Sequence, residues 1–188
     1  MKKLVIGISG ASGVQLGVEL LKALKDIPDV ESHLVISDNS LVTIEQETSL
    51  KVEDVYALAD KVYGFYDMAA AISSGSFKTD GMIIIPCSMK TLAGAANGFS
   101  ENLLLRAADV TIKEGRKLVV VPREAPFSRI HLRNMLTLQE CGAVIIPPVM
   151  TFYSGQETAI EMAAYLNGKI LDQFGIDYSG YKRWRSEE

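Results

Sequence analysis

The sequence of 188 residues lacks three features that would point to particular partners. It has no block of like charge, because 19 basic residues face 23 acidic ones for a net charge of −4, so the basic surface that binds nucleic acid is missing. No apolar run approaches the roughly 20 residues of a membrane span, and the first apolar run, after Met1, is too short for a signal-peptide core. We therefore expect a cytoplasmic protein with no nucleic-acid partner and no membrane span.

Cysteine and histidine are also scarce, with two residues of each. Cys87 and Cys141 have no partners at metal-ligand spacing, and without a secretory signal two thiols usually stay reduced. His33 and His131 stand outside any C-x-x-C or H-E-x-x-H pattern. The sequence therefore predicts no metal site, favours free thiols over a disulfide, and assigns Cys87 to the core.

Hydrophobic residues, by contrast, make up 48% of the chain, enough for the core of one domain over residues 1–188. Several runs are apolar on successive residues, as strands covered on both faces must be. These runs are 3–9, 32–37, 81–86, 117–122 and 142–147. Helical patterns alternate with them, including 13–26, 102–115 and 129–142, the last two ending at Gly115 and Gly142.

This alternation predicts an α/β fold, a single doubly wound and mostly parallel sheet with helices on both faces. Three of the apolar runs end in proline, at Pro86, Pro122 and Pro147. Proline cannot donate a ladder hydrogen bond, so each one predicts the end of a strand. Because ligands of open parallel sheets bind beyond the carboxyl ends of the strands, we expect the site in the loops after these prolines.

The loop GISGASGVQLG, residues 7–17, joins the first predicted strand to the first helix. Its glycine spacing is G-x-x-G-x-x-G, which fails the dinucleotide fingerprint. Gly10 and Gly13 still allow a tight turn, and Ser9 and Ser12 offer hydroxyls beside a helix N-terminus. Contact with an anion or a polar ring edge is favoured, and a plain turn with a serine cap is the alternative.

Two later loops carry polar side chains directly after buried strands. Ser88, Lys90 and Thr91 open a helix, and the sequence is equally compatible with ligand contact and with a simple capped start. Arg123 and Glu124 follow the strand 117–122. An arginine can hold a phosphate through two donors, and a carboxylic acid can protonate a leaving oxygen.

Other charged and polar residues either extend this site or lie apart from it. Tyr153 could add a hydroxyl donor and Lys169 a positive charge, so the loops together suit a phosphorylated substrate. Arg116 and Lys117 are instead predicted to lie on a solvated helix end.

Read together, these segments resemble the UbiX/Pad-type flavin prenyltransferases over nearly the whole chain. The resemblance is carried by SGASG (9–13), AAAISSGSFKTDGMIIIPCSMKTLAG (69–94), RAADVTIKEGRKLVVVPRE (106–124), IHLRNML (130–136) and LDQFGI (171–176). It implies a Rossmann-like, flavodoxin-related fold that usually forms a homododecamer. It also implies transfer of a dimethylallyl group from dimethylallyl phosphate to N5 and C6 of reduced FMN. The product, prenylated FMN, is the cofactor of UbiD-type decarboxylases.

The resemblance also implies roles for individual residues, some of them acting in a neighbouring subunit's site, and no metal. It implies catalytic roles for Ser12, Lys113, Arg123, Glu124 and Tyr153, with Ser12 near flavin N5. It implies FMN contacts at Gly10, Ala11, Ser12, Ser37, Ser88, Met89, Lys90, Thr91, Arg106 and Arg123. It implies contacts with the prenyl phosphate at Glu47, Lys113, Arg123, Glu124, Tyr153, Lys169 and Trp184.

Two departures from the family pattern concern the prenyl phosphate. Lys169 stands where relatives commonly have arginine, which keeps the charge and loses the two-pronged fork, and PVMTFY (148–153) replaces the commoner Pro-Ala-Phe-Tyr. Two other functions remain open. One is an FMN-dependent decarboxylase of related fold that acts on a peptidyl or pantothenoyl cysteine. The other is a non-catalytic FMN carrier or accessory subunit of an aromatic-acid decarboxylase.

Overall fold

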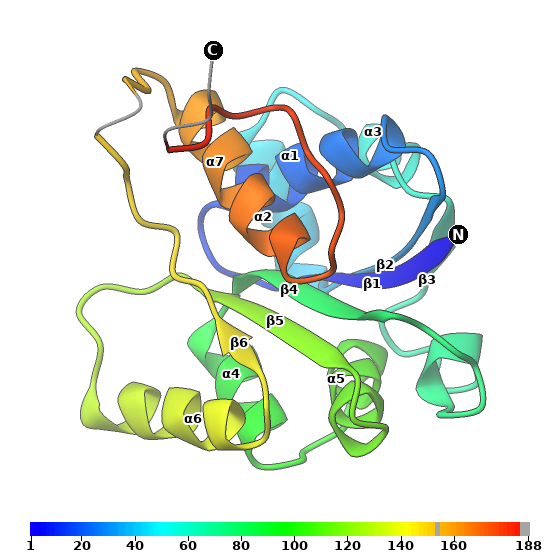
Figure 1. Cartoon of the computed structure of the whole chain (residues 1–188). Coiled ribbons are helices and arrows are strands. Elements are labelled where there is room, and N and C mark those ends of the chain that lie inside the picture. The colour runs from blue at the N-terminus through cyan, green and yellow to red at the C-terminus, as the bar shows by residue number, and fades with distance from the viewer. Residues whose placement is uncertain (153–154, 185–188) are drawn as a thin grey trace.

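The computed structural model describes residues 1–152 and 155–184, and its strands form one parallel sheet (Figure 1). The strands are β1 (Lys2–Ile8), β2 (Val30–Ile36), β3 (Lys61–Tyr63), β4 (Gly81–Cys87), β5 (Lys117–Pro122) and β6 (Val144–Ile145). The helices are α1 (Val14–Lys25), α2 (Asp38–Glu47), α3 (Val52–Tyr56), η1 (Ala71–Ser73), α4 (Met89–Ala96), α5 (Leu103–Lys113), α6 (Arg129–Glu140) and α7 (Ala159–Asp172). None of the helices in the described ranges is long and apolar enough to cross a membrane.

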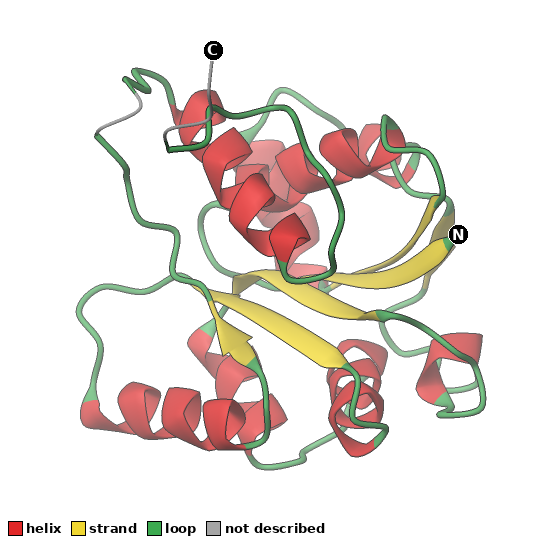
Figure 2. Cartoon of the chain, in the orientation of Figure 1, coloured by secondary structure: helices red, strands yellow, loops and turns green. Residues whose placement is uncertain are grey.

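The strand order, β3-β2-β1-β4-β5-β6, is the Rossmann order, and every neighbouring pair is parallel. Without the three-residue edge strand β3, the other five strands follow the flavodoxin order. Helices cover both faces of the sheet (Figure 2). The predicted doubly wound α/β fold is therefore confirmed.

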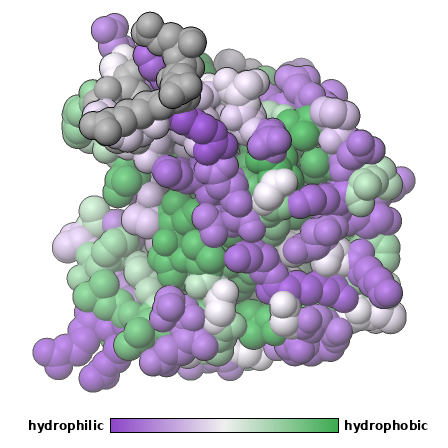
Figure 3. Space-filling view, in the orientation of Figure 1, coloured by the Kyte–Doolittle hydropathy of each residue, from purple (hydrophilic) through white to green (hydrophobic). Residues whose placement is uncertain are grey.

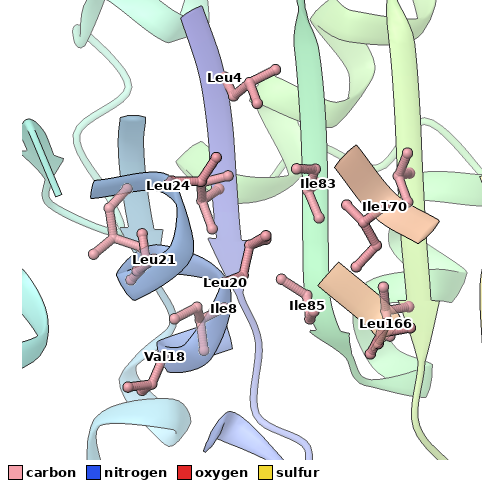
Figure 4. Close-up of a cluster of buried hydrophobic side chains, with 14 of the residues drawn as sticks. Leu4, Ile8, Val18, Leu20, Leu21, Leu24, Ile83, Ile85, Leu166 and Ile170 are labelled. Carbon is pink, nitrogen blue, oxygen red and sulfur yellow. The ribbon is translucent and has the colours of Figure 1, made fainter. Parts of the chain in front are cut away.

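The side chains of each strand divide between two hydrophobic clusters, one on each face of the sheet. Leu4 and Ile8 of β1 enter the cluster under α1 and α7 (Figure 4), whereas Val5 enters the cluster under α4 and α5. The same division holds in β4 for Ile83 and Ile84. Burial on both faces explains why the strand residues are apolar in succession rather than in alternation.

Several element boundaries differ from the predicted ones. The run 142–147 forms only the two-residue strand β6, which lies at the sheet edge and pairs with β5 alone. Pro86 does not end its strand, because β4 continues to Cys87 through a shift in register after Ile84. Pro122 does end β5.

The glycines at the helix ends behave as predicted. Gly115 and Gly142 lie just beyond α5 and α6 and have φ angles of 65° and 88°. Such left-handed backbone favours glycine, so each one stops a helix without strain.

A glycine in α1 allows this helix to lie against the carboxyl end of β4. A Cβ atom on Gly17 would be 2.6 Å from the carbonyl oxygen of Ile85 and 2.9 Å from Cδ1 of Ile8. The first of these atoms is backbone, so a larger residue would force α1 and β4 apart. The missing side chain therefore sets the position of the N-terminus of α1 and of the loop before it.

We expect Gly17→Ala to lower the free energy of unfolding by about 1–3 kcal/mol, as overpacking of a close contact does. Gly64→Ala is a suitable control, because the nearest atom to its added Cβ would be Asp67 Cβ at 3.8 Å. Urea denaturation measures both variants. An equal loss of stability in the two would contradict the close-approach argument.

Candidate functional site

The loops after β1 and β4 meet where the strand order reverses, and a buried serine joins them. Ser9 is completely inaccessible to solvent, and its Oγ donates to the carbonyl oxygen of Pro86 at 3.0 Å. The same Oγ accepts from the backbone N–H of Ser88 at 2.8 Å. In open α/β sheets, ligands bind beyond the strand ends at this reversal. Ser9 thus holds together the two loops that border the expected site.

The N-terminus of α1 is occupied by a side chain of the protein itself. The backbone N–H groups of Gly13 and Val14 donate to Oε2 of Glu47, at 2.7 Å and 3.1 Å. Glu47 is the last residue of α2, so its carboxylate satisfies free donors at the positive end of α1. A ligand anion at this helix start would have to displace Glu47. Of the two ligand contacts predicted for the loop, the ring-edge contact is therefore the better supported.

A cavity of about 390 Å³, here called the polar cavity, lies on one side of this loop. Residues predicted from the sequence line much of it: Gly10, Ser37, Ser88, Met89, Lys90, Thr91 and Glu124. The sequence did not single out several others: Asn39, Phe65, Tyr66, Asn102 and Leu105. Phe65 and Tyr66 follow the three-residue strand β3, which is too short to show as an apolar run, so no sequence signal placed them at the site.

Three helices begin at the polar cavity, and α2 is the one among them without a side-chain cap. In α5, Asn102 Oδ1 accepts from the N–H of Leu105 at 3.0 Å. In α4, Ser88 Oγ accepts from the N–H of Thr91 at 3.3 Å. In α2, the hydroxyl of Ser37 instead shares a hydrogen bond with Ser40 Oγ at 2.8 Å. Among the described residues, the N–H groups of Asp38 and Asn39 donate to no acceptor. The start of α2 therefore presents free donors that suit an anionic group.

A second cavity, of about 380 Å³ and here called the apolar cavity, lies on the other side of the same loop. It is lined by Ser12 and Arg123 and by apolar side chains that include Leu16, Met162 and Leu166. Nε of Arg123 donates to the carbonyl oxygen of Ser12 at 2.7 Å. No hydrogen bond to another described residue uses the Nη groups of Arg123, so they can hold a phosphate.

The consecutive residues Arg123 and Glu124 face different cavities. Arg123 lines the apolar cavity and Glu124 lines the polar cavity. Glu124 is exposed, and its Oε1 accepts only from the N–H of Ala125 among the described residues, at 3.0 Å. This pair therefore joins the two cavities and can act on a molecule that spans them.

Lys169 and Trp184, which were also predicted to contact the prenyl phosphate, do not line the apolar cavity. Lys169 lines a neighbouring cavity of about 260 Å³, which shares Val149 and Leu166 with the apolar cavity. Trp184 is 65% exposed and lines neither the polar nor the apolar cavity. Tyr153 lies outside the described residues. Lys169 is thus near the apolar cavity, with Leu166 between them.

Two predicted residues on α5 lie away from both cavities. Arg106 is held by η1, with Nε donating to the carbonyl oxygen of Ser73 at 3.0 Å and Nη1 donating to Asp109 at 2.7 Å. Lys113 ends α5 and pairs with Glu114, and this hydrogen bond and charge lower the pKa of the Glu114 carboxyl. Neither residue lines the polar or the apolar cavity.

Within one chain, Lys113 and Arg123 lie far apart, as expected if some residues of the predicted prenyl-phosphate site come from a neighbouring subunit. Lys113 lies before the start of β5 and Arg123 after its end. The six residues of β5 cover roughly 20 Å at about 3.3 Å a residue, which puts the two side chains at opposite edges of the sheet. Within one chain, Lys113 therefore cannot contact a ligand held by Arg123.

The prediction of a solvated Arg116 is wrong. Its Nη2 donates to the carbonyl oxygen of Gly75 at 2.7 Å, and its Nη1 donates to that of Phe77 at 2.9 Å. Arg116 therefore fastens the segment before β4 to the end of α5, beside Lys113. Lys117 is exposed, as expected.

The two cysteines are unpaired, and the described acidic residues form no group that could hold a metal ion. Both cysteines are free, and burial strongly raises the pKa of the Cys87 thiol, so it remains neutral in the core as predicted. Within residues 1–152 and 155–184, no group of three His, Cys, Asp or Glu side chains could hold a metal ion.

We expect Glu47→Ala to lower the free energy of unfolding by about 1 kcal/mol, because it removes a partner for two N–H groups and a charge at a helix N-terminus. Glu47→Gln should lose about half as much, since its amide oxygen still accepts. Denaturation at low and high salt measures both. A variant as stable as the wild-type protein would show that Glu47 does not hold the loop.

The chain matches the family model described as Flavoprotein over residues 1–172. It is 58% identical over 182 residues to the "Probable UbiX-like flavin prenyltransferase" of Sedimentibacter hydroxybenzoicus. That match covers 97% of this chain and 96% of the relative.

Two solved structures are similar along almost the whole chain. The dodecameric FMN-dependent Ubix-like decarboxylase from Escherichia coli O157:H7 superposes with a TM-score of 0.96 at 52% identity, covering 98% of this chain and 100% of that one. AnUbiX (PadA1), in complex with FMN and dimethylallyl pyrophosphate, has a TM-score of 0.96 at 46% identity, covering 100% and 99%. The chain therefore belongs to the Flavoprotein family and, within it, to the UbiX-like flavin prenyltransferases.

Proposed function

We propose that the protein is a flavin prenyltransferase, which transfers a dimethylallyl group from dimethylallyl phosphate to N5 and C6 of reduced FMN. The product is prenylated FMN. One observation carries this proposal: the polar cavity and the apolar cavity flank the same loop, and Arg123 and Glu124 face one each. A flavin and a prenyl phosphate bound in the two cavities would therefore meet at Ser12.

The polar cavity has the donor groups that FMN needs. The free N–H groups of Asp38 and Asn39 suit the FMN phosphate. Hydroxyls of Ser37 and Ser88 and the aromatic rings of Phe65 and Tyr66 suit the polar edges and faces of the rest of the molecule. AnUbiX, which is 46% identical to this chain, is a complex with FMN, and this supports FMN as the ligand.

The residues around the apolar cavity suit departure of a phosphate from an allyl group. Cationic and hydroxyl groups stabilise the charge that develops on the phosphate as the C–O bond breaks. We assign this role to Arg123, Lys169 and Tyr153, together with Lys113 of a neighbouring subunit. Glu124 donates a proton to the departing phosphate. The apolar walls keep water from the allyl carbon.

Exposed apolar side chains support an assembly of many subunits, and we infer a homododecamer. Hydrophobic surface gathers on the side of the molecule where β6 and α6 lie (Figure 3). Exposed apolar side chains of α6 and of the segment after β6 are Ile130, Leu132, Leu136, Val149, Met150 and Phe152. Patches of this kind usually mark contact with another protein. The distance between Lys113 and Arg123 in one chain requires such a contact for a complete site.

The wider setting follows from the product and the fold. We infer that residues 1–188 form one flavin-binding domain, that it acts in the cytoplasm, and that a UbiD-type decarboxylase receives the prenylated FMN. A cysteine decarboxylase would have no need for the unoccupied donors of Arg123, and an FMN carrier would have no need for the apolar cavity. Each of these two alternative functions therefore leaves either Arg123 or the apolar cavity without a role.

The function is tested by incubating the full-length protein anaerobically with reduced FMN and dimethylallyl phosphate and weighing the extracted flavin. We expect the mass of FMN to rise by one C5H8 unit. Dimethylallyl pyrophosphate in a parallel reaction tests which donor is used. Unchanged FMN with both donors would favour one of the rival functions.

We expect Glu124→Gln to slow flavin adduct formation in a single turnover by about 100-fold, the lower range of general acid catalysis. FMN binding should change little, because the amide keeps the size of the side chain. Glu140→Gln, exposed at the end of α6, serves as the control. A full single-turnover rate in Glu124→Gln would remove its role as proton donor.

A further inference from the structure

The C-terminal end of α5 carries an ion pair that lies on the backbone of a glycine. Nζ of Lys113, the last residue of the helix, is 2.5 Å from Oε1 of Glu114. A Cβ atom on Gly75 would be 2.1 Å from that oxygen and 2.9 Å from that nitrogen. The φ angle of Gly75 is not positive, so the backbone conformation does not require glycine there. The missing side chain instead leaves room for both charged groups.

The segment beneath this ion pair is held in place by two arginines. Nε of Arg106 donates to the carbonyl oxygen of Ser73 at 3.0 Å. Nη2 of Arg116 donates to the carbonyl oxygen of Gly75 itself at 2.7 Å, and Nη1 donates to that of Phe77 at 2.9 Å. Because the backbone is bound at Gly75 and on both sides of it, the ion pair rests on a fixed surface.

The charges around Lys113 leave its ammonium group able to bind an anion. The hydrogen bond from Lys113 and the positive charges of Lys113 and Arg116 lower the pKa of the Glu114 carboxyl, so this group is ionised at neutral pH. With two positive groups and one negative group, the three residues together remain positively charged. An ammonium group has three donors, and the pair with Glu114 uses one. The Lys113 side chain is 45% exposed in one chain, so a phosphate held by a neighbouring subunit can reach it.

A lysine that is held in advance binds a phosphate more tightly than one that moves freely. Its flexible four-carbon stem loses conformational freedom when the ammonium group is fixed. If the ligand itself has to fix this group, the loss weakens binding. Here the carboxylate of Glu114 and the backbone of Gly75 already hold the ammonium group of Lys113 in the free protein.

We propose that Glu114 is a positioning residue, which holds the ammonium group of Lys113 on Gly75, ready for the phosphate of the prenyl donor in a neighbouring subunit. Glu114 acts through Lys113 and contacts no substrate. The inference rests on the proposed prenyl transfer, in which Lys113 stabilises the departing phosphate. It adds the two residues on which the placement of Lys113 depends.

Single-turnover rates of flavin adduct formation by the full-length protein, measured over a range of dimethylallyl phosphate concentrations, test the proposal. We expect Glu114→Ala to raise the half-saturating concentration about fivefold and to change the limiting rate less, because the ammonium group is then ordered only as the donor binds. The Kd for FMN and the size of the assembly should not change. Glu140→Ala, at another exposed glutamate, is the control. A parallel loss of FMN affinity or of assembly would show that Glu114 has only a structural role.

Gly75→Ala tests the surface on which the ion pair rests. The added Cβ would displace the ends of two flexible side chains rather than backbone, so the Tm should change little while the half-saturating concentration again rises about fivefold. Combined with Glu114→Ala, it should add less than it does alone, because both changes release the same ammonium group.

Two outcomes would overturn the positioning role while leaving the proposed function intact. They are a wild-type half-saturating concentration in both single variants and full additivity of the two changes, each alongside normal prenyl transfer by the wild-type protein. Absence of prenyl transfer by the wild-type protein would overturn the proposed function and this inference with it.

Discussion

The hydroxyl of Ser9 ties the first strand to the fourth at the point where the strand order of the sheet reverses. It donates to the carbonyl oxygen of Pro86 and accepts from the N–H of Ser88, so the loops after β1 and β4 cannot move apart without leaving buried polar groups unpaired. Both proposed ligand cavities open on one or other of these loops. The arrangement of the site therefore depends on this one buried hydroxyl.

Two charged side chains then hold the loop after β1 from either side. Glu47 binds the start of α1, and Arg123 binds the carbonyl oxygen of Ser12. With α1 already bound to a carboxylate, the protein has no need of a phosphate at this helix start. The loop is instead a narrow wall between two cavities of different character, and that is the geometry in which two different molecules can be brought into contact. In a reaction that joins them, this supplies proximity.

Helix α7 separates two cavities of the molecule. One of its faces, with Met162 and Leu166, lines the apolar cavity, and another, with Ala164 and Asn167, lines a cavity of about 530 Å³ between α1 and α7. A helix buried on more than one side must be apolar around much of its surface, and the buried residues of α7 are apolar except for Asn167. The amide oxygen of Asn167, which has no hydrogen-bond partner among the described residues, is therefore a departure from the local pattern.

Much of the fold could be predicted from the sequence because it depends on local patterns. Runs of successive apolar residues predicted strands buried on both faces, and Gly115 and Gly142 predicted the ends of two helices. The strand β3 and the helices α2 and α3 escaped notice, since three residues are too few to form a pattern and α2 has only two buried side chains. Because β3 was not predicted, Phe65 and Tyr66, which follow it and line the polar cavity, were not predicted as site residues either.

By itself the sequence determined the alternation of strand and helix, and with it the edge of the sheet where Ser12, Ser88, Arg123 and Glu124 gather. Only the tertiary structure decided which of these residues lines which cavity. The side chains of Arg123 and Glu124 are neighbours in sequence, but the local backbone conformation directs them into different cavities. It also decided that Lys113 lies far from Arg123, since Lys113 precedes β5 and Arg123 follows it, so the two residues lie at opposite ends of this strand. Contacts between residues 34 positions apart, such as that of Glu47 with Gly13, leave no periodic trace in a sequence. Packing of the folded chain is what brings them together.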